Sequence, residues 1–198
     1  MNYLAHLFLA QPTTPSRVGN LLGDFAKGVN TAMLPPEVYR GLQNHRQVDL
    51  FTDQHPQVMA LKPLFSQQRR RFAGIALDLA FDHFLIKHWG QFCAEPFLVV
   101  CQRYYASLLA GQNLMPVSMQ HTTQRIVAQD WFSSYATLEG VGYALDRIAG
   151  RIRFDHQFAG IYEELYRLES EIETGFLRFF PELQQQVSLQ RIEAEQDL

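Results

Sequence analysis

Apolar side chains recur at intervals of three and four residues along most of this chain, and this spacing is the strongest constraint on its fold. It is the period of a helix that buries one face, and no stretch shows the sustained alternation of apolar and polar residues that a half-buried strand requires. With 47% hydrophobic residues in a length of 198, the chain can bury a substantial core. We therefore expect residues 1–198 to form a single all-α domain, a helical bundle.

Prolines and glycines divide the chain into the expected helices. The segment from Arg17 to Gly28 carries three glycines, which favour close backbone approach and a turn beside Asp24. We expect helices over residues 2–10, 36–54, 69–92, 96–110, 117–133, 137–151 and 158–178, a further helix from Pro56, and breaks at Gly111, Pro116 and Pro181. The 69–92 helix has little polar surface and should lie centrally. The polar residues 191–198 should fray.

Charge and composition narrow the possible functions. The formal net charge of -3 and a pI near 6.1 give no overall basic character, so we expect no nucleic-acid binding. Cys93 and Cys101 match no zinc or disulfide spacing, which favours two reduced thiols. The N-terminus lacks a basic leader and no apolar run reaches the length of a membrane span. We expect a cytoplasmic protein without membrane contact, and the oligomeric state does not follow from the sequence.

Acidic and histidine side chains with metal-binding chemistry concentrate in the first 83 residues. His45, Asp49 and Asp53 follow one another at i,i+4 spacing, which places them on one helix face, and Asp78 and Asp82 repeat that spacing. A mixture of imidazole and carboxylate ligands is typical of metal sites that activate water. The expected metal ligands are His6, Asp24, His45, Asp82 and His83.

Further polar residues are expected to support this site. The candidates for positions beside the ligands are Asn20, Asp49, Asp53 and Asp78. A cationic group near a metal site fits recognition of a phosphate or of an acidic protein surface. The candidates for that role are Lys27, Arg46, Arg69, Arg70 and Arg71.

A purely structural interpretation of the same residues stays open. A buried histidine is often a hydrogen-bonded core residue, and Asp49 or Asp53 can cap a helix or pair with a neighbouring Arg46 or histidine. Asp78 can pair with an arginine, and a run of three arginines can be a solvated surface.

Four segments carry a family resemblance when they are taken together. They are MNYLAHL from Met1, GNLLGDF from Gly19, HRQVD from His45 followed by FTDQHP, and AGIALDLAFDHFL from Ala73. In combination they resemble the bacterial acyl carrier protein phosphodiesterases, also called acyl carrier protein hydrolases. The resemblance is dense to about residue 90 and looser beyond it. It implies a manganese-dependent helical enzyme, related to the HD-type metal phosphohydrolases, that removes the 4'-phosphopantetheine arm from holo acyl carrier protein and restores the apo form.

The resemblance also implies roles for individual residues. Asp24 is the strongest catalytic or metal-binding position, and His6, His45, Asp82 and His83 follow from their matching motifs. The dyad reads Asp82-His83, the reverse of the usual HD order, so HD ligand roles do not transfer directly.

The leaving alkoxide needs a proton, for which His55 is a catalytic candidate. Two other functions stay open: a related metal phosphohydrolase of a small nucleotide or phosphate ester, and a non-enzymatic helical interaction protein whose acidic cluster is an ion-pair network.

Overall fold

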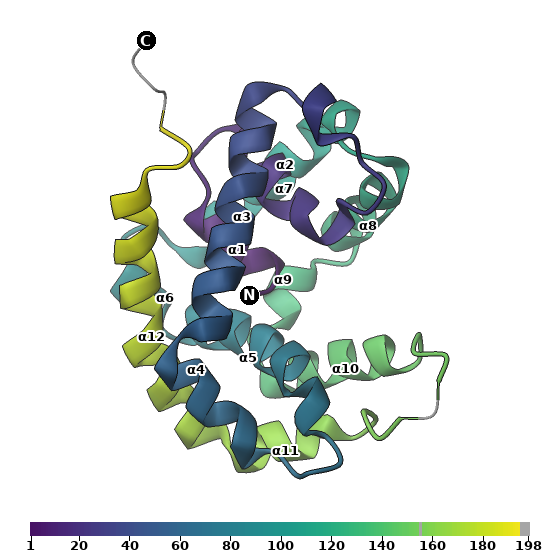
Figure 1. The fold of residues 1–198 in the computed structure, drawn as a ribbon, viewed down its shortest axis with the longest axis vertical. Coiled ribbons are helices and arrows are strands. Elements are labelled where there is room, and N and C mark those ends of the chain that lie inside the picture. Colours follow the sequence, from purple (N-terminus) through teal and green to yellow (C-terminus); the bar gives the residue numbers. More distant parts are fainter. Residues whose placement is uncertain (155, 195–198) are drawn as a thin grey trace.

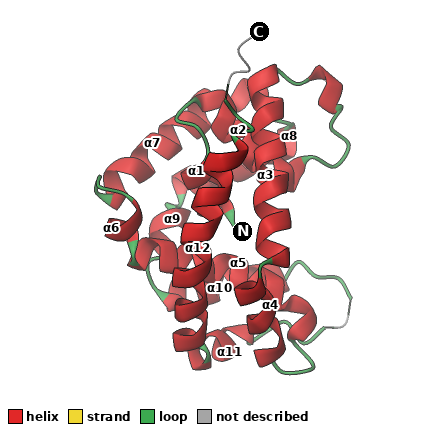
Figure 2. Cartoon of the chain, turned by 60° about the vertical axis from the view of Figure 1, so that its left-hand side comes forward, coloured by secondary structure: helices red, strands yellow, loops and turns green. Residues whose placement is uncertain are grey.

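The computed structural model describes residues 1–154 and 156–194, and every regular element in these ranges is a helix, as predicted (Figure 2). The α-helices are α1 (Tyr3–Leu9), α2 (Thr14–Leu22), α3 (Pro36–Gln54), α4 (Pro56–Leu61), α5 (Ala73–Lys87), α6 (Trp89–Phe92), α7 (Phe97–Ala110), α8 (Val117–Ala128), α9 (Trp131–Ser134), α10 (Leu138–Ala149), α11 (Ile161–Arg167) and α12 (Glu169–Gln190). Across the described ranges, none of these helices has the length and apolarity needed to cross a membrane.

Local signals fix where several helices begin. Pro36 is the first residue of α3, where its missing N–H removes no helical hydrogen bond. The hydroxyl of Thr13 accepts a hydrogen bond from the backbone of Ser16 at the start of α2, and Thr137 does the same for Gly140 at the start of α10. Because such signals lie in neighbouring residues, the starts of α3, α7 and α10 fall within one residue of their predicted positions.

Two predicted helices are interrupted in the structure. The predicted 69–92 helix consists of a 3-10 turn at Arg70–Phe72, then α5, then α6 after a non-helical residue at His88. The predicted 117–133 helix is broken at Asp130, whose left-handed backbone (φ 46°) separates α8 from α9. A break of one or two residues hardly changes the spacing of apolar residues, so the sequence pattern did not reveal it.

The predicted break at Pro181 is wrong. The predicted 158–178 helix is replaced by α11 and α12, which meet at Leu168, and α12 continues through Pro181 to Gln190. A proline inside a helix removes one hydrogen bond and clashes with the preceding turn. Its neighbours Phe180 and Leu183 are fully buried, and their packing offsets that cost. Of the residues predicted to fray, 195–198 lie outside the described ranges.

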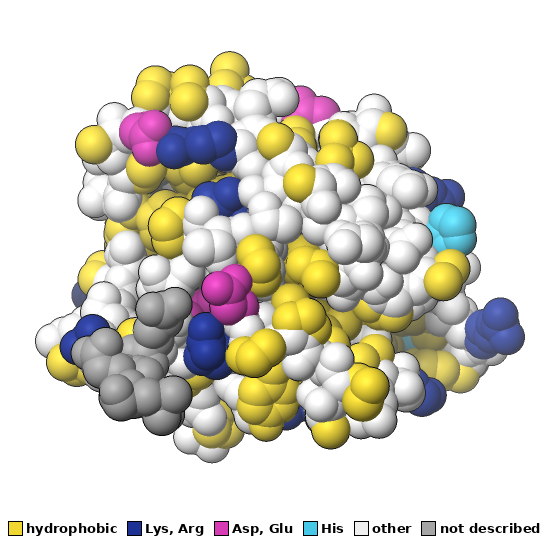
Figure 3. Space-filling view, turned by 90° about the horizontal axis from the view of Figure 1, so that it is seen from above, with side chains coloured by type: hydrophobic (Ala, Val, Ile, Leu, Met, Phe, Trp, Pro, Cys, Tyr) yellow, Lys and Arg dark blue, Asp and Glu magenta, His cyan; other side chains and the backbone are white. Residues whose placement is uncertain are grey.

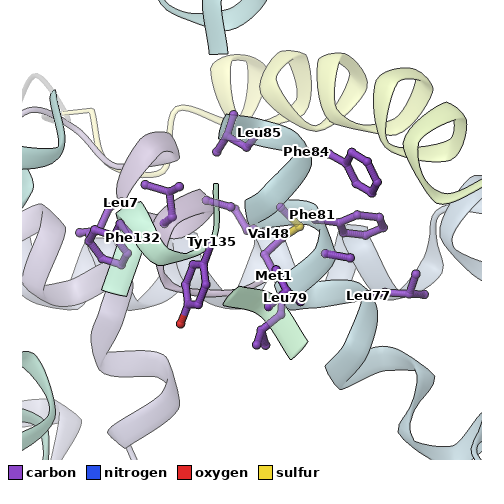
Figure 4. Close-up of a cluster of buried hydrophobic side chains, with 14 of the residues drawn as sticks. Met1, Leu7, Val48, Leu77, Leu79, Phe81, Phe84, Leu85, Phe132 and Tyr135 are labelled. Carbon is purple, nitrogen blue, oxygen red and sulfur yellow. The ribbon is translucent and has the colours of Figure 1, made fainter. Parts of the chain in front are cut away.

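Helix α5 lies at the centre of the bundle, as predicted, and packs against α1, α10, α11 and α12. The N-terminus of the chain is near the middle of the molecule, close to α1, α3 and α5 (Figure 1). Figure 4 shows the side chains of Met1 and Val48 among the buried residues of α5, which include Leu79 and Phe81. The start of the chain is therefore part of the core beside α3 and α5.

Two glycines allow α2 and α3 to pack closely. A Cβ atom on Gly19 would lie 2.2 Å from the carbonyl oxygen of Val38, and one on Gly41 would lie 2.6 Å from that of Ser16. The close backbone approach predicted for the glycine-containing segment is therefore confirmed. It holds the end of α2 against the middle of α3, where His45 is located.

Candidate metal centre

His6, His45 and Asp49 bring three possible ligand atoms together between α1 and α3. The two carboxylate oxygens of Asp49 lie 3.1 Å from Nε2 of His6 and 3.0 Å from Nε2 of His45. The two imidazole rings stack with their centroids 3.9 Å apart. Ligand atoms of the three residues all lie within 4.8 Å of one another, which makes them the one metal-sized group in the part of the chain that the structure describes.

A backbone carbonyl orients His45. Nδ1 of His45 lies 2.6 Å from the carbonyl oxygen of Asn20, and since a carbonyl can only accept, Nδ1 must carry the proton. Nε2 is then the ring nitrogen that faces Asp49. The ring fits only because residue 23 is glycine: a Cβ atom on Gly23 would lie 1.9 Å from Cδ2 of His45. The predicted turn beside Asp24 is the 3-10 helix that begins at this glycine.

His6 is fully buried, and neither of its ring nitrogens makes a hydrogen bond. Nε2 is close to an oxygen of Asp49, but the contact lacks hydrogen-bond geometry. Desolvation lowers the pKa of His6 to about 3, so the imidazole is neutral at neutral pH. Buried nitrogen atoms are normally satisfied by a partner. A neutral imidazole without one, next to a carboxylate, has the chemistry of a metal ligand.

Negative charge surrounds this group on its solvent side. The ammonium of Met1 lies 3.2 Å from Asp49 and 3.0 Å from Asp78, whose side chains are 40% and 36% exposed. Burial alone would lower the pKa of this ammonium, but the two carboxylates raise it to about 10. Burial would raise the pKa of Asp49, but His45 and His6 hold it well below its ordinary value. Asp49 therefore stays ionised and favours a cation beside it.

Asp24 belongs to the same neighbourhood and is exposed to solvent. The pKa of Asp24 is raised, mainly because the surrounding protein desolvates it. The neighbouring His45 opposes this shift, and the negative charges of Asp49 and Asp78 add to it. Asp24 therefore interacts electrostatically with His45, Asp49 and Asp78. The structure brings Asp24, His6 and His45 together, as the sequence predicted, and adds Asp49 and Asp78 directly to the cluster.

Asp82 and His83 do not join this cluster. The carboxylate of Asp82 accepts hydrogen bonds from Nδ2 of Asn2 at 2.8 Å and from two backbone amides of α1 at 2.9 and 3.1 Å. It therefore caps the start of α1. Nδ1 of His83 donates to the carbonyl oxygen of Tyr135 at 2.9 Å. The sequence predicted that Asp82 and His83 would both be metal ligands with His6 and His45. The structure does not place them there, because Asp82 bonds to the backbone of α1 and His83 bonds to the backbone of Tyr135.

Two further expected residues lie away from the cluster. His55 follows His45 by ten residues, roughly 15 Å along the chain if helical rise is taken, and its Nε2 contacts Glu182 of α12 at 3.1 Å. Asp53 forms an exposed ion pair with Lys62 at 2.9 Å. The position of His55, in contact with Glu182, does not support its predicted role as the proton donor. Asp53 continues the i,i+4 spacing of His45 and Asp49, but that spacing extends along α3 beyond the site.

Asn20 joins several elements through its side chain. Its oxygen accepts from Nδ2 of Asn44 at 2.9 Å, and its nitrogen donates to Glu193 at 2.9 Å and to the carbonyl of Ser16 at 3.0 Å. Glu193, in the polar end predicted to fray, also accepts from the hydroxyl of Ser16. These bonds fix the backbone of Asn20, whose carbonyl orients His45. Asn20 was predicted to support the site, and it does so through its backbone carbonyl, which orients His45. A pattern of side chains in the sequence could not indicate this contact.

Arg69 has internal partners. Its guanidinium lies 3.2 Å from Glu164 and donates to the carbonyl oxygens of Gln157 and Ala159 at 2.9 Å each. These contacts hold the 3-10 turn before α5 against the segment that precedes α11. Arg70 donates to the carbonyl of Pro63 at 3.2 Å from an exposed position. The expected role of Arg69 in partner binding would therefore compete with its structural contacts.

The remaining expected cationic residues are near the surface. The guanidinium of Arg71 lies over the rings of Phe72 and Phe154, at 4.5 and 5.5 Å from their centroids. Arg46 and Lys27 are exposed. Lysine and arginine side chains on the face seen in Figure 3 form separate patches and not one continuous basic field.

Sequence reasoning missed a cavity beside the cluster. It has a volume of about 390 Å³ and is enclosed by the start of α1, by α9 with its flanking residues, and by α10. Two of its residues, Arg147 and Arg151, follow at i,i+4 spacing near the end of α10, which is a signal that the sequence did contain.

Comparison with known proteins decides the family of this chain. The sequence profile described as "Acyl carrier protein phosphodiesterase" matches residues 1–183, a range that contains the whole cluster around His45. The chain belongs to the acyl carrier protein phosphodiesterase family. The resemblance recognised in the first 90 residues is confirmed, and it extends through α11 and into α12.

Curated members of the acyl carrier protein phosphodiesterase family are similar to this chain over nearly their full length. The relative from Serratia proteamaculans is 38% identical, with 94% of this chain and 97% of the relative covered. The relative from Yersinia pestis is 33% identical, with 97% and 100% covered, and one from Escherichia coli is 31% identical, with 95% and 98% covered. No solved structure matches, so the relationship to HD-type phosphohydrolases stays a prediction.

Proposed function

We propose that this protein is a metal-dependent phosphodiesterase that removes the 4'-phosphopantetheine arm from holo acyl carrier protein and leaves the apo form. The family and the names of its curated members support the reaction and the substrate. The observation that carries the metal dependence is His6, whose buried, neutral ring has no hydrogen bond and faces His45 and Asp49.

The residues present fit a manganese ion. Two imidazoles and a carboxylate, from His6, His45 and Asp49, form the mixed nitrogen and oxygen set that first-row divalent metals accept. Asp24 and Asp78 lie at the solvent side, and their negative charge favours a cation in this set. When bound, Mn²⁺ lowers the pKa of a coordinated water and neutralises charge on the phosphodiester.

The protein's own side chains have separate tasks in this proposal. Asn20 fixes the proton of His45 on Nδ1 and so keeps Nε2 available as a ligand. Asp24 is exposed and has a raised pKa, which suits a carboxylate that accepts the proton of the attacking water. The attack forms a bond between the water oxygen and phosphorus and breaks the bond between phosphorus and the serine oxygen of the carrier. The serine oxygen takes up the proton that Asp24 received, so the products are 4'-phosphopantetheine and the hydroxyl of the apo protein.

The test is intact-mass analysis of holo acyl carrier protein after incubation with the protein and Mn²⁺. We expect loss of the phosphopantetheine mass with the wild type and no loss after chelation or with Asp49→Ala. His88→Ala is a matched control, because His88 pairs with Glu173 at the surface between α5 and α12. Mass loss that persists after exhaustive chelation would contradict metal dependence.

The same experiment separates the two alternative functions. Turnover of small phosphodiesters without turnover of the carrier would indicate a phosphohydrolase of small substrates. A folded protein that retains no metal and changes no substrate would indicate an interaction protein, in which the cluster of His6, His45 and Asp49 is an ion-pair network.

A further inference from the structure

The cavity beside the metal centre has the size of a small-molecule site. Its volume of about 390 Å³ falls within the usual range for such pockets. Aromatic side chains form much of its wall, namely Tyr3, Trp131, Tyr135 and Tyr143. Figure 1 shows the elements that enclose it, with α9 and α10 beside the N-terminus of the chain.

One end of the cavity adjoins the metal centre. Leu79 lines the cavity and directly follows Asp78, while Tyr3 lines it from the first turn of α1. Burial raises the pKa of Tyr3, the nearby charge of Asp24 raises it further, and Arg151 opposes both effects. The ring of Tyr3 also stacks on that of Phe25, which directly follows Asp24, with the ring centroids 6.2 Å apart. Tyr3 therefore links the cavity to the neighbourhood of Asp24.

The lining is cationic, and no carboxylate is among the described residues that form it. Arg147 donates to Gln129 at 3.3 Å and lies over the rings of Trp131 and Tyr143, at 5.5 and 5.8 Å from their centroids. The guanidinium of Arg151 has no hydrogen bond or ion pair with another described residue, and only its backbone N–H donates, to the carbonyl of Ile148. A guanidinium without a carboxylate partner is available to a phosphate oxygen of a ligand, which it can bind with charge-assisted hydrogen bonds.

We propose that this cavity binds the phosphopantetheine arm of the substrate, an inference that rests on the proposed function. The arm is a flexible chain of amide and apolar groups with a phosphodiester at one end. Arg151 contacts a phosphate oxygen at the end next to the metal centre. The aromatic rings pack against the chain, and the side chains of Asn2, Gln129 and Ser134 supply hydrogen bonds for its amides.

The test uses Arg151→Gln and Trp131→Ala in the full-length protein loaded with Mn²⁺. We expect the KM for holo acyl carrier protein to rise, and inhibition by free 4'-phosphopantetheine to weaken, by about tenfold or more, because a charge-assisted bond or an aromatic anchor contributes that much affinity. Hydrolysis of bis(p-nitrophenyl) phosphate, which has the phosphodiester but lacks the arm, should keep its kcat/KM in Trp131→Ala and lose activity in Arg151→Gln, because Arg151 contacts a phosphate oxygen. Arg178→Gln, on the exposed face of α12, is the matched control and should leave all three values unchanged.

Three outcomes would overturn the inference or separate it from the proposed function. Unchanged KM and inhibition in both variants would overturn it, and so would equal losses on the carrier and on the small diester in Trp131→Ala, which would mean that Trp131 does not contact the arm. If the wild type fails to cleave the carrier, the proposed function fails. Equilibrium binding of 4'-phosphopantetheine then tests the cavity alone: binding that Arg151→Gln weakens supports it, and absent or unchanged binding overturns it.

Discussion

Nδ1 of His45 lies 2.6 Å from the backbone carbonyl of Asn20, and this contact decides which nitrogen of the imidazole is available as a ligand. The carbonyl accepts a hydrogen bond from Nδ1, so Nε2 is the nitrogen that faces the space shared with Asp49 and His6. The bond joins the end of α2 to the middle of α3, and the glycines that let these helices approach each other are therefore part of the site's construction.

Gly23→Ala should damage the metal centre without unfolding the protein. The added Cβ would lie within 2.4 Å of three ring atoms of His45, so the ring must move. Loss of a ligand's correct orientation typically lowers metal affinity by about 10- to 100-fold. Isothermal titration with Mn²⁺ measures the change. Gly74→Ala is the control, because its Cβ would meet nothing within 4 Å; equal affinities in the two variants would contradict this account of Gly23.

Replacing His45 and His55 should have different effects. His45→Ala removes a ligand and should lower metal affinity by more than about a hundredfold, together with activity. His55→Ala removes a contact with Glu182 and ring contacts with Phe51 and Phe179, and should lower stability while kcat is retained. Metal content, melting temperature and kcat separate the two effects. A large fall in kcat for a folded, metal-loaded His55→Ala would restore His55 as a proton donor.

Asp82→Ala should destabilise the protein by about 2 to 4 kcal/mol, because two buried backbone amides and the half-buried amide of Asn2 at the start of α1 lose their acceptor. Metal stoichiometry should stay at the wild-type value. Urea denaturation and metal analysis measure the two quantities. The exposed Asp146→Ala on α10 is the control and should change stability by less than about 0.5 kcal/mol. Loss of bound metal with unchanged stability would instead favour Asp82 as a ligand.

Glu164 should make stability depend on acid pH. Burial would raise its pKa, but hydrogen bonds from Ser66 and the charge of Arg69 lower it below the ordinary value of 4.5. A carboxyl whose folded-state pKa is depressed stabilises the fold above the unfolded-state pKa and loses that contribution as pH falls through the folded-state pKa. The stability difference between wild type and Glu164→Gln should therefore shrink below about pH 4.5. Urea denaturation from pH 3 to 7 measures it, and a constant difference would argue against this role.

Arg70 and Arg71 are predicted to contact the acidic surface of the carrier protein. Their replacement by Glu should weaken binding of the acidic carrier and reduce the salt dependence of its KM, because opposite charges across an interface are screened by salt. The measurement is KM for holo acyl carrier protein at low and moderate ionic strength. Arg178→Glu on α12 is the matched charge reversal. Unchanged affinity and salt dependence in the double variant would exclude this surface.

The sequence determined the helical class, most helix starts and the central place of α5, because caps, prolines and apolar spacing act over a few residues. It also indicated His6, Asp24 and His45 as one group through its family motifs. It could not predict that α12 continues through Pro181, since the phenylalanines that offset the proline are effective only when packed against other helices.

Only the tertiary structure decided which acidic and histidine residues share the site. Asp78 and Asp82 lie one turn apart on α5, yet Asp78 joins the cluster and Asp82 caps α1. Their partners differ because different parts of the N-terminal segment lie next to them: the Met1 ammonium beside Asp78 and the backbone of Ala5 beside Asp82. The orienting carbonyl of Asn20 and the cavity beside Tyr3 likewise depend on backbone positions from different helices. Residue spacing fixes which side chains share a helix face, whereas their partners come from packing between helices that are distant in sequence.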